Sequence, residues 1–108
     1  MSFLSAHVLD ASTGTPAAGV EVRLSDEDGT PLAAATTDAG GRVAELGPDT
    51  LVPGDYRVAF SVGAYFGRQG QDCFYPVVEV HFTVRATEAH YHIPLLASPF
   101  AYTTYRGS

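Results

Sequence analysis

The 108-residue sequence contains no lysine and a single cysteine, Cys73. One thiol cannot form an internal disulfide and offers no zinc–thiolate cluster. Six arginines against twelve acidic residues give a net charge of −6. Because nucleic acids and anionic membranes are bound largely through Lys and Arg, we expect neither as a partner. The lack of a disulfide also favours a reducing compartment such as the cytoplasm.

Long apolar runs are missing as well. No stretch approaches the roughly 20 apolar residues that a membrane-spanning helix requires. The opening MSFLSAHVLD lacks the basic start and the long apolar segment of a signal peptide. A chain of 108 residues has a length typical of one domain and is long enough to bury a core. We therefore expect a single cytoplasmic domain over residues 1–108.

What the sequence does contain is an alternation of apolar and polar residues with a period of two. It is clearest in three segments: 20–25, 56–62 and 78–84. Shorter strands are expected at 31–37 and 43–46, next to the turn sequences DEDG and DAGGR. Only residues 63–76 break the pattern, and they could hold one short helix and a loop. Seven or eight short strands with regular turns predict an antiparallel β-sandwich with one short helix.

Two of the expected strands place histidines on the face opposite the core. Near the N-terminus, the side chains on this face are those of Ser5, His7 and Leu9. Near the C-terminus, they are those of His90, His92, Pro94 and Leu96. A face that mixes imidazoles with aliphatic groups is typical of a pocket or a subunit contact. Proline within a strand additionally requires an edge or an irregularity.

Three motifs carry a resemblance that spans the whole chain. They are the opening HVLDASTGTPAAGVEV, the central TTDAGGR and the terminal HYHIPLLASPFAYTTYRGS. Together they resemble the transthyretin-like 5-hydroxyisourate hydrolases. The first two motifs also resemble β-sandwich repeats of adhesins and carboxypeptidase accessory domains, whereas HYH and the terminal YRGS are far more specific. In transthyretin itself, the hormone-carrying relative, the histidines and YRGS are replaced.

The resemblance implies a fold, an assembly and an activity. The fold is a transthyretin-like (prealbumin-type) sandwich, assembled as a homotetramer with two active sites at a dimer–dimer interface. The activity is ring-opening of a cyclic amide in 5-hydroxyisourate to 2-oxo-4-hydroxy-4-carboxy-5-ureidoimidazoline, on the route from urate to allantoin, without a cofactor. The implied catalytic residues are His7, Arg42, His92 and Ser108. The implied substrate-binding residues are His7, Arg42, Tyr105, Arg106 and Gly107.

These residue types suit the implied chemistry. Imidazole titrates near neutral pH, so His7 and His92 could act as general base and proton relay for attack by water. Arg42 could hold an oxygen-rich anionic ring through its planar fork of donors, and Arg106 would add positive potential. Hydroxyls of Tyr105 or Ser108 could donate to carbonyls or to a developing oxyanion. Which histidine takes the proton from water is left open.

Other interpretations of the same residues also stay open. His7, His90 and His92 could bind zinc, but no carboxylate or thiolate completes the set at a companion spacing, so no metal is expected. A transthyretin-like carrier of a small ligand, without catalysis, is the main alternative to the enzyme. A structural stalk module is a third possibility. His90 either lines the mouth of the site or contacts solvent, and His81 is expected to be a solvent-facing residue.

Overall fold

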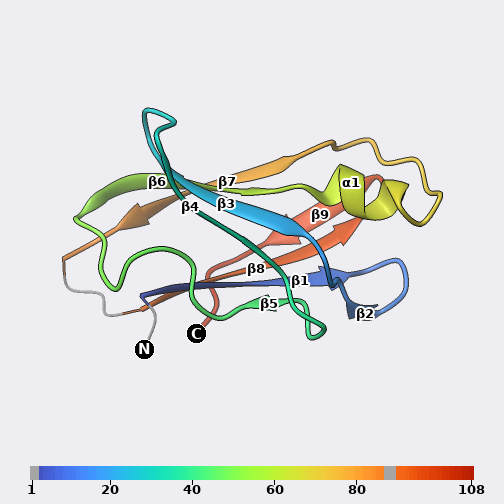
Figure 1. Cartoon of the computed structure of the whole chain (residues 1–108), viewed down its shortest axis with the longest axis horizontal. Coiled ribbons are helices and arrows are strands. Elements are labelled where there is room, and N and C mark those ends of the chain that lie inside the picture. Colours follow the sequence, from blue (N-terminus) through green and yellow to red (C-terminus); the bar gives the residue numbers. More distant parts are fainter. Residues whose placement is uncertain (1–2, 87–89) are drawn as a thin grey trace.

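The computed structural model describes residues 3–86 and 90–108, whose strands form two stacked sheets (Figure 1). The first sheet has the order β4–β3–β6–β7. Its strands are β3 (Glu21–Asp26), β4 (Pro31–Thr36), β6 (Gly54–Phe60) and β7 (Val78–Val84). The second has the order β2–β1–β8–β9, with β5 also paired to β1. Its strands are β1 (Leu4–Asp10), β2 (Thr15–Pro16), β5 (Arg42–Val43), β8 (Tyr91–Ser98) and β9 (Ala101–Thr104).

The predicted all-β sandwich with one short helix is confirmed. Helix α1 (Val62–Gly67) lies within the region where the alternation breaks. The described residues form nine strands, and one of them, β2, is a two-residue strand too short for the pattern to reveal. The pairing of β1 with β8 is parallel, while the other pairings in the two sheets are antiparallel. The strand expected at 43–46 is shorter than predicted, since β5 ends at Val43.

The core lies between the two sheets and is built from alternate residues of each strand. Leu4, Val8, Leu24, Phe60 and Leu95 are all at most 1% exposed. Because successive strand residues face opposite sides, burying these side chains leaves their neighbours on the outer face. In β1 and β8, those neighbours include both predicted catalytic histidines. No helix in the described residues is long and apolar enough to cross a bilayer.

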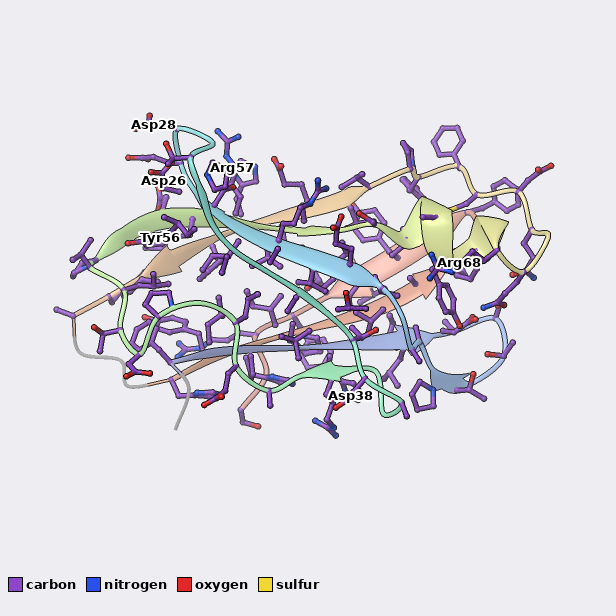
Figure 2. The ribbon with its side chains drawn as sticks, in the orientation of Figure 1. Asp26, Asp28, Asp38, Tyr56, Arg57 and Arg68 are labelled. Atoms are coloured by element: carbon purple, nitrogen blue, oxygen red, sulfur yellow. The ribbon has the colours of Figure 1, made fainter. Side chains whose placement is uncertain are left out.

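Helix α1 is attached to the second sheet through a buried carboxylate. Asp10, at the end of β1, is 1% exposed, and its Oδ2 accepts a hydrogen bond from the Tyr65 hydroxyl at 2.9 Å. Its Oδ1 accepts the backbone N–H of Ser12 at 2.9 Å and the Ser12 hydroxyl at 2.5 Å. Burial by itself raises the pKa of Asp10, but these hydrogen bonds outweigh it, so the pKa lies below its ordinary value. Arg68, which follows α1, donates to the Gly19 carbonyl at 2.7 Å (Figure 2).

Replacing Tyr65 with Phe should lower the free energy of unfolding by about 1–3 kcal/mol at pH 7, because a buried carboxylate loses a donor. The folded-state pKa of Asp10 is lowered, so ionised Asp10 stabilises the fold above the pKa of the unfolded chain. That contribution is lost as the pH falls through the folded-state pKa, and the effect of Tyr65→Phe should shrink with it. Urea denaturation at matched protein concentrations checks both statements. Tyr75→Phe is the control, and an equal loss in that variant would contradict the assignment.

Candidate functional site

The parallel pairing of β1 with β8 brings the two predicted catalytic histidines onto one face. In this register, Ser5 lies beside His92, and His7 lies beside Pro94. Ser5, His7 and His92 are all partly buried, on the outer face of the sheet. The two imidazoles are therefore diagonal neighbours on adjacent strands.

The turn before β5 brings Arg42 to the same face. Arg42 pairs with His7 across β5 and β1. The Asp38 carboxylate folds this turn: its Oδ1 accepts the N–H groups of Gly40 at 2.9 Å and Arg42 at 3.0 Å (Figure 2). Gly41 has a φ of +74°, and a Cβ there would clash with a backbone oxygen of β1. Only glycine allows the turn to approach β1 this closely.

The same turn fixes the tautomer of His7. Its Nε2 lies 3.0 Å from the Gly40 carbonyl oxygen. A carbonyl oxygen can only accept, so Nε2 carries the hydrogen. In the neutral ring, Nδ1 is then the basic nitrogen.

Ser5 is a site residue that the sequence analysis did not identify as functional. Its Oγ lies 2.8 Å from Nδ1 of His92 and 3.3 Å from Nε2 of His90. The alternation in β1 already places Ser5 on the same face as His7. The missing signal was the parallel register with β8, which sets Ser5 directly beside His92.

The C-terminal segment returns to β8 after a gap, and this explains how Pro94 fits within a strand. Pairing of β9 with β8 ends at Leu95 and Thr104, and pairing resumes at His92 and Gly107. Pro94 lies opposite the gap, where its missing N–H costs no ladder hydrogen bond. Its carbonyl oxygen accepts the Thr104 hydroxyl at 2.8 Å.

Gly107 lets the terminal segment pack directly on the His92 ring. Its N–H donates to the His92 carbonyl at 2.9 Å. A Cβ at this position would overlap Cδ2 of His92. Ser108 follows directly and lines the same cavity as His92, which places the end of the described chain at the site (Figure 1).

These elements enclose a shallow cavity of about 330 Å³ on the outer face of the sheet. It is lined by Ser5, Ala6, Arg42, Val43, Ala44, His90, His92 and Ser108. None of these lining residues is acidic, although the chain as a whole has a net charge of −6. The cavity therefore favours an anionic or oxygen-rich ligand.

Tyr105 and Arg106 lie elsewhere in the single chain. Both line a neighbouring cavity of about 450 Å³ that also contacts His92. The Arg106 guanidinium carbon lies 4.8 Å from the centre of the Tyr91 ring, within the range of a cation–π contact. Of the predicted set, the structure thus brings Arg42, His92 and Ser108 to one cavity. His7 does not line this cavity, but it pairs with Arg42 across β1 and β5. Gly107 lies beneath His92.

The surroundings of His92 lower its pKa below the ordinary value for imidazole. The largest cause is burial, which disfavours the charged ring. Positive charge on His7, Arg42 and His90 acts in the same direction. His92 is therefore neutral at pH 7 and able to accept a proton.

The histidines do not form a metal cluster among the described residues. Across residues 3–86 and 90–108, no group of three His, Cys, Asp or Glu side chains is arranged to hold a metal ion. His81 is exposed on β7, and its Nε2 lies 3.0 Å from Oε1 of Glu79. It lines the neighbouring cavity of about 450 Å³ and not the cavity that contains Arg42 and Ser108.

The fold and the cavity define a transthyretin-like β-sandwich protein with a small basic histidine site. The family model for "HIUase/Transthyretin family" matches residues 4–107. A 5-hydroxyisourate hydrolase of Salmonella dublin is 47% identical over 111 residues, covering 99% of this chain and 82% of the relative. The chain therefore belongs to the HIUase/transthyretin family.

The solved structures that resemble this chain include a 5-hydroxyisourate hydrolase and a transthyretin. Klebsiella pneumoniae 5-hydroxyisourate hydrolase superimposes with a TM-score of 0.90 at 42% identity, covering 100% of this chain and 94% of the other. Sea bream transthyretin in complex with thyroxine superimposes with a TM-score of 0.90 at 39% identity, covering 97% and 94%. Overall shape therefore does not separate enzyme from carrier, and the site residues must do so.

The lowered pKa of His92 can be tested by following its imidazole signals by NMR as a function of pH. We expect a midpoint below the ordinary value near 6.5. Arg42→Gln removes a facing positive charge and should raise the midpoint. Arg23→Gln, on the other sheet, is the control and should leave it unchanged. A wild-type midpoint at or above the ordinary value would refute this view of the site.

Proposed function

We propose that this chain hydrolyses 5-hydroxyisourate by attack of water on a carbonyl of its cyclic amide. The observation that carries the proposal is the meeting of His7, Arg42 and His92 at one site in this chain, which is 47% identical to a 5-hydroxyisourate hydrolase. The product retains both fragments of the opened ring, as a carboxylate and a ureido group. No cofactor is needed, because hydrolysis is acid–base chemistry.

In this proposal His92 is the general base. Its lowered pKa keeps it neutral, and Ser5 contacts its Nδ1, so Nε2 is the nitrogen that takes a proton from water. His7 is the second member of the pair, with Nδ1 as its basic atom, and it assists in binding and in proton transfer. Ser5, which contacts His92, and His7 lie on the same face of β1. This arrangement supports joint action of the two histidines.

Arg42 and Ser108 would handle the charge that develops on the substrate. The Arg42 guanidinium offers a planar set of donors to the carbonyls of an anionic ring. Ser108 lines the same cavity as His92, and its hydroxyl would donate to the oxyanion formed when water attacks. Both residues would therefore stabilise the transition state more than the ground state.

The three residues before Ser108 would support substrate binding. Gly107 has no side chain, so the terminal segment can pack against the His92 ring and form one side of the site. Arg106 and Tyr105 reach the neighbouring cavity that shares His92, from which Arg106 would contribute positive potential. Stacking of Arg106 on Tyr91 also helps to hold the segment in place.

We also propose a homotetramer. Within the described residues, β7 pairs only with β6 and β9 pairs only with β8, so each presents an open edge. Such edges can continue into a second copy of the chain. Phe74, Phe100 and Tyr102 are 71%, 68% and 42% exposed, which supports a further apolar contact.

Sedimentation equilibrium tests the assembly. We expect a mass four times that of one chain. A monomer at micromolar concentration would contradict both tetrameric interpretations, enzyme and carrier, and would favour a stalk module.

For location we propose the cytoplasm, because the single Cys73 provides no structural disulfide. Detection of the native protein in a secreted fraction would overturn this proposal.

A carrier role is the second candidate, favoured by the 39% identity to a transthyretin that binds thyroxine. The basic, histidine-lined cavity argues against it, since polar and cationic side chains would have to be desolvated by an apolar ligand. The two functions differ in one observable, which is turnover.

The proposed hydrolysis is tested by oxidising urate enzymatically and following the ultraviolet decay of fresh 5-hydroxyisourate with and without the protein. We expect strong acceleration over spontaneous decay at catalytic concentrations. His92→Asn should reduce kcat by at least about 100-fold, because the general base is lost. Arg23→Gln, on β3 of the other sheet, is the control and should retain full activity.

Two results would go against the proposal. A folded wild-type protein that does not accelerate the decay would exclude the hydrolase and favour the carrier. Near-normal turnover in the folded His92→Asn variant would instead exclude His92 as the base while leaving the activity intact.

A further inference from the structure

If the proposed function holds, proton transfer to His92 places an additional positive charge in a site that is already basic. When Nε2 accepts a proton from water, the ring becomes a cation. It is then faced by His7 on β1, Arg42 on β5 and His90, which immediately precedes β8. None of the described residues that line the cavity is acidic. A path that removes the charge from His92 would therefore favour the reaction.

The Ser5 hydroxyl lies in such a path. Its Oγ is 2.8 Å from Nδ1 of His92 and 3.3 Å from Nε2 of His90. A hydroxyl can accept one hydrogen bond while it donates another. His92 and Ser5 are partly buried, whereas His90 is exposed. The two contacts of Ser5 thus connect Nδ1 of His92 with the exposed His90.

We propose that Ser5 and His90 form a proton relay that connects His92 to solvent. At rest, Nδ1–H of His92 donates to Ser5 Oγ, and the Ser5 hydroxyl donates to Nε2 of His90. When Nε2 of His92 takes a proton from the attacking water, the Nδ1 proton passes to Ser5 Oγ. The hydroxyl proton of Ser5 passes to Nε2 of His90, which releases a proton from its Nδ1 to solvent.

The reverse movement completes the cycle. His90 Nδ1 takes a proton from solvent, Nε2 of His90 returns one to Ser5, and Ser5 returns one to Nδ1 of His92. At the same time Nε2 of His92 gives its proton to the ring nitrogen that leaves the carbonyl carbon. One proton leaves through the relay in the first step and one enters in the second, so His92 regains its starting tautomer. In this relay Ser5 and His90 act on the reaction through His92.

Four variants separate the relay from a structural role. Ser5→Ala removes the hydroxyl, and His90→Asn removes the outer acceptor. Each should lower kcat about tenfold or more in dilute buffer, with little change in KM. Ser5→Thr keeps the hydroxyl and should retain most of the activity. Arg23→Gln, at an exposed arginine on β3 of the other sheet, should behave like wild type.

Buffer rescue supplies a readout that a packing defect would not show. Raising the imidazole concentration should restore turnover in His90→Asn, because the buffer can accept the proton from Ser5. It should restore Ser5→Ala far less, since the break lies between the buffer and His92. Thermal unfolding of each variant confirms that the fold is retained.

Three results would overturn the relay while leaving the proposed hydrolysis in place. The first is a wild-type turnover rate in both Ser5→Ala and His90→Asn. The second is a reduced rate in His90→Asn that imidazole does not restore. The third is a rate in Ser5→Thr as low as that in Ser5→Ala. A wild-type protein without activity would instead refute the proposed function.

The hydrogen-bonded line can also be tested without turnover, by ¹⁵N NMR of the imidazoles. Protonating His90 should shift the Nδ1 resonance of His92 in the wild type, and Ser5→Ala should abolish this coupling. Independent behaviour of the two rings in the wild-type protein would overturn the relay whatever the activity.

Discussion

The parallel pairing of β1 with β8 is the contact on which the site depends. Its register sets Ser5 beside His92 and places His7 one step further along the same face. A shift of the register by one residue would turn these side chains into the core, because strand side chains alternate between faces. The buried residues Leu4, Val8 and Leu95 oppose such a shift. Packing of the core therefore fixes the geometry of the site on the other side of the sheet.

Alternation in the sequence predicted the sandwich and the outward position of His7 and His92, since both follow from burying every second residue. The parallel direction of β1 and β8 could not be predicted, because it depends on contacts between distant segments. The contacts of Ser5 depend on that direction. The role of Asp38 could not be predicted either, because an aspartate in a turn sequence does not reveal which N–H groups will donate hydrogen bonds to its carboxylate. The family resemblance supplied the residue roles, which stay predictions until variants are measured.

The end of the described chain is ordered by local chemistry. Pro94 lacks an N–H at the gap in the pairing, and Gly107 lacks the side chain that would displace His92. Together they let the segment return to β8 and carry Ser108 into the cavity. The same sandwich superimposes on a thyroxine-bound transthyretin, so the fold alone does not distinguish an enzyme from a carrier. The terminal packing and the basic face of β1 and β8 are the features that favour catalysis over carriage of a ligand.

The central claim is that water attacks an amide carbonyl of 5-hydroxyisourate at this site. The most direct measurement is the transfer of ¹⁸O from labelled water during turnover, read by mass spectrometry of the ring-opened product. We expect one ¹⁸O atom in the new carboxylate, formed at the accelerated rate and lost with His92→Asn. Substrate that disappears at an accelerated rate without incorporation of label would contradict it.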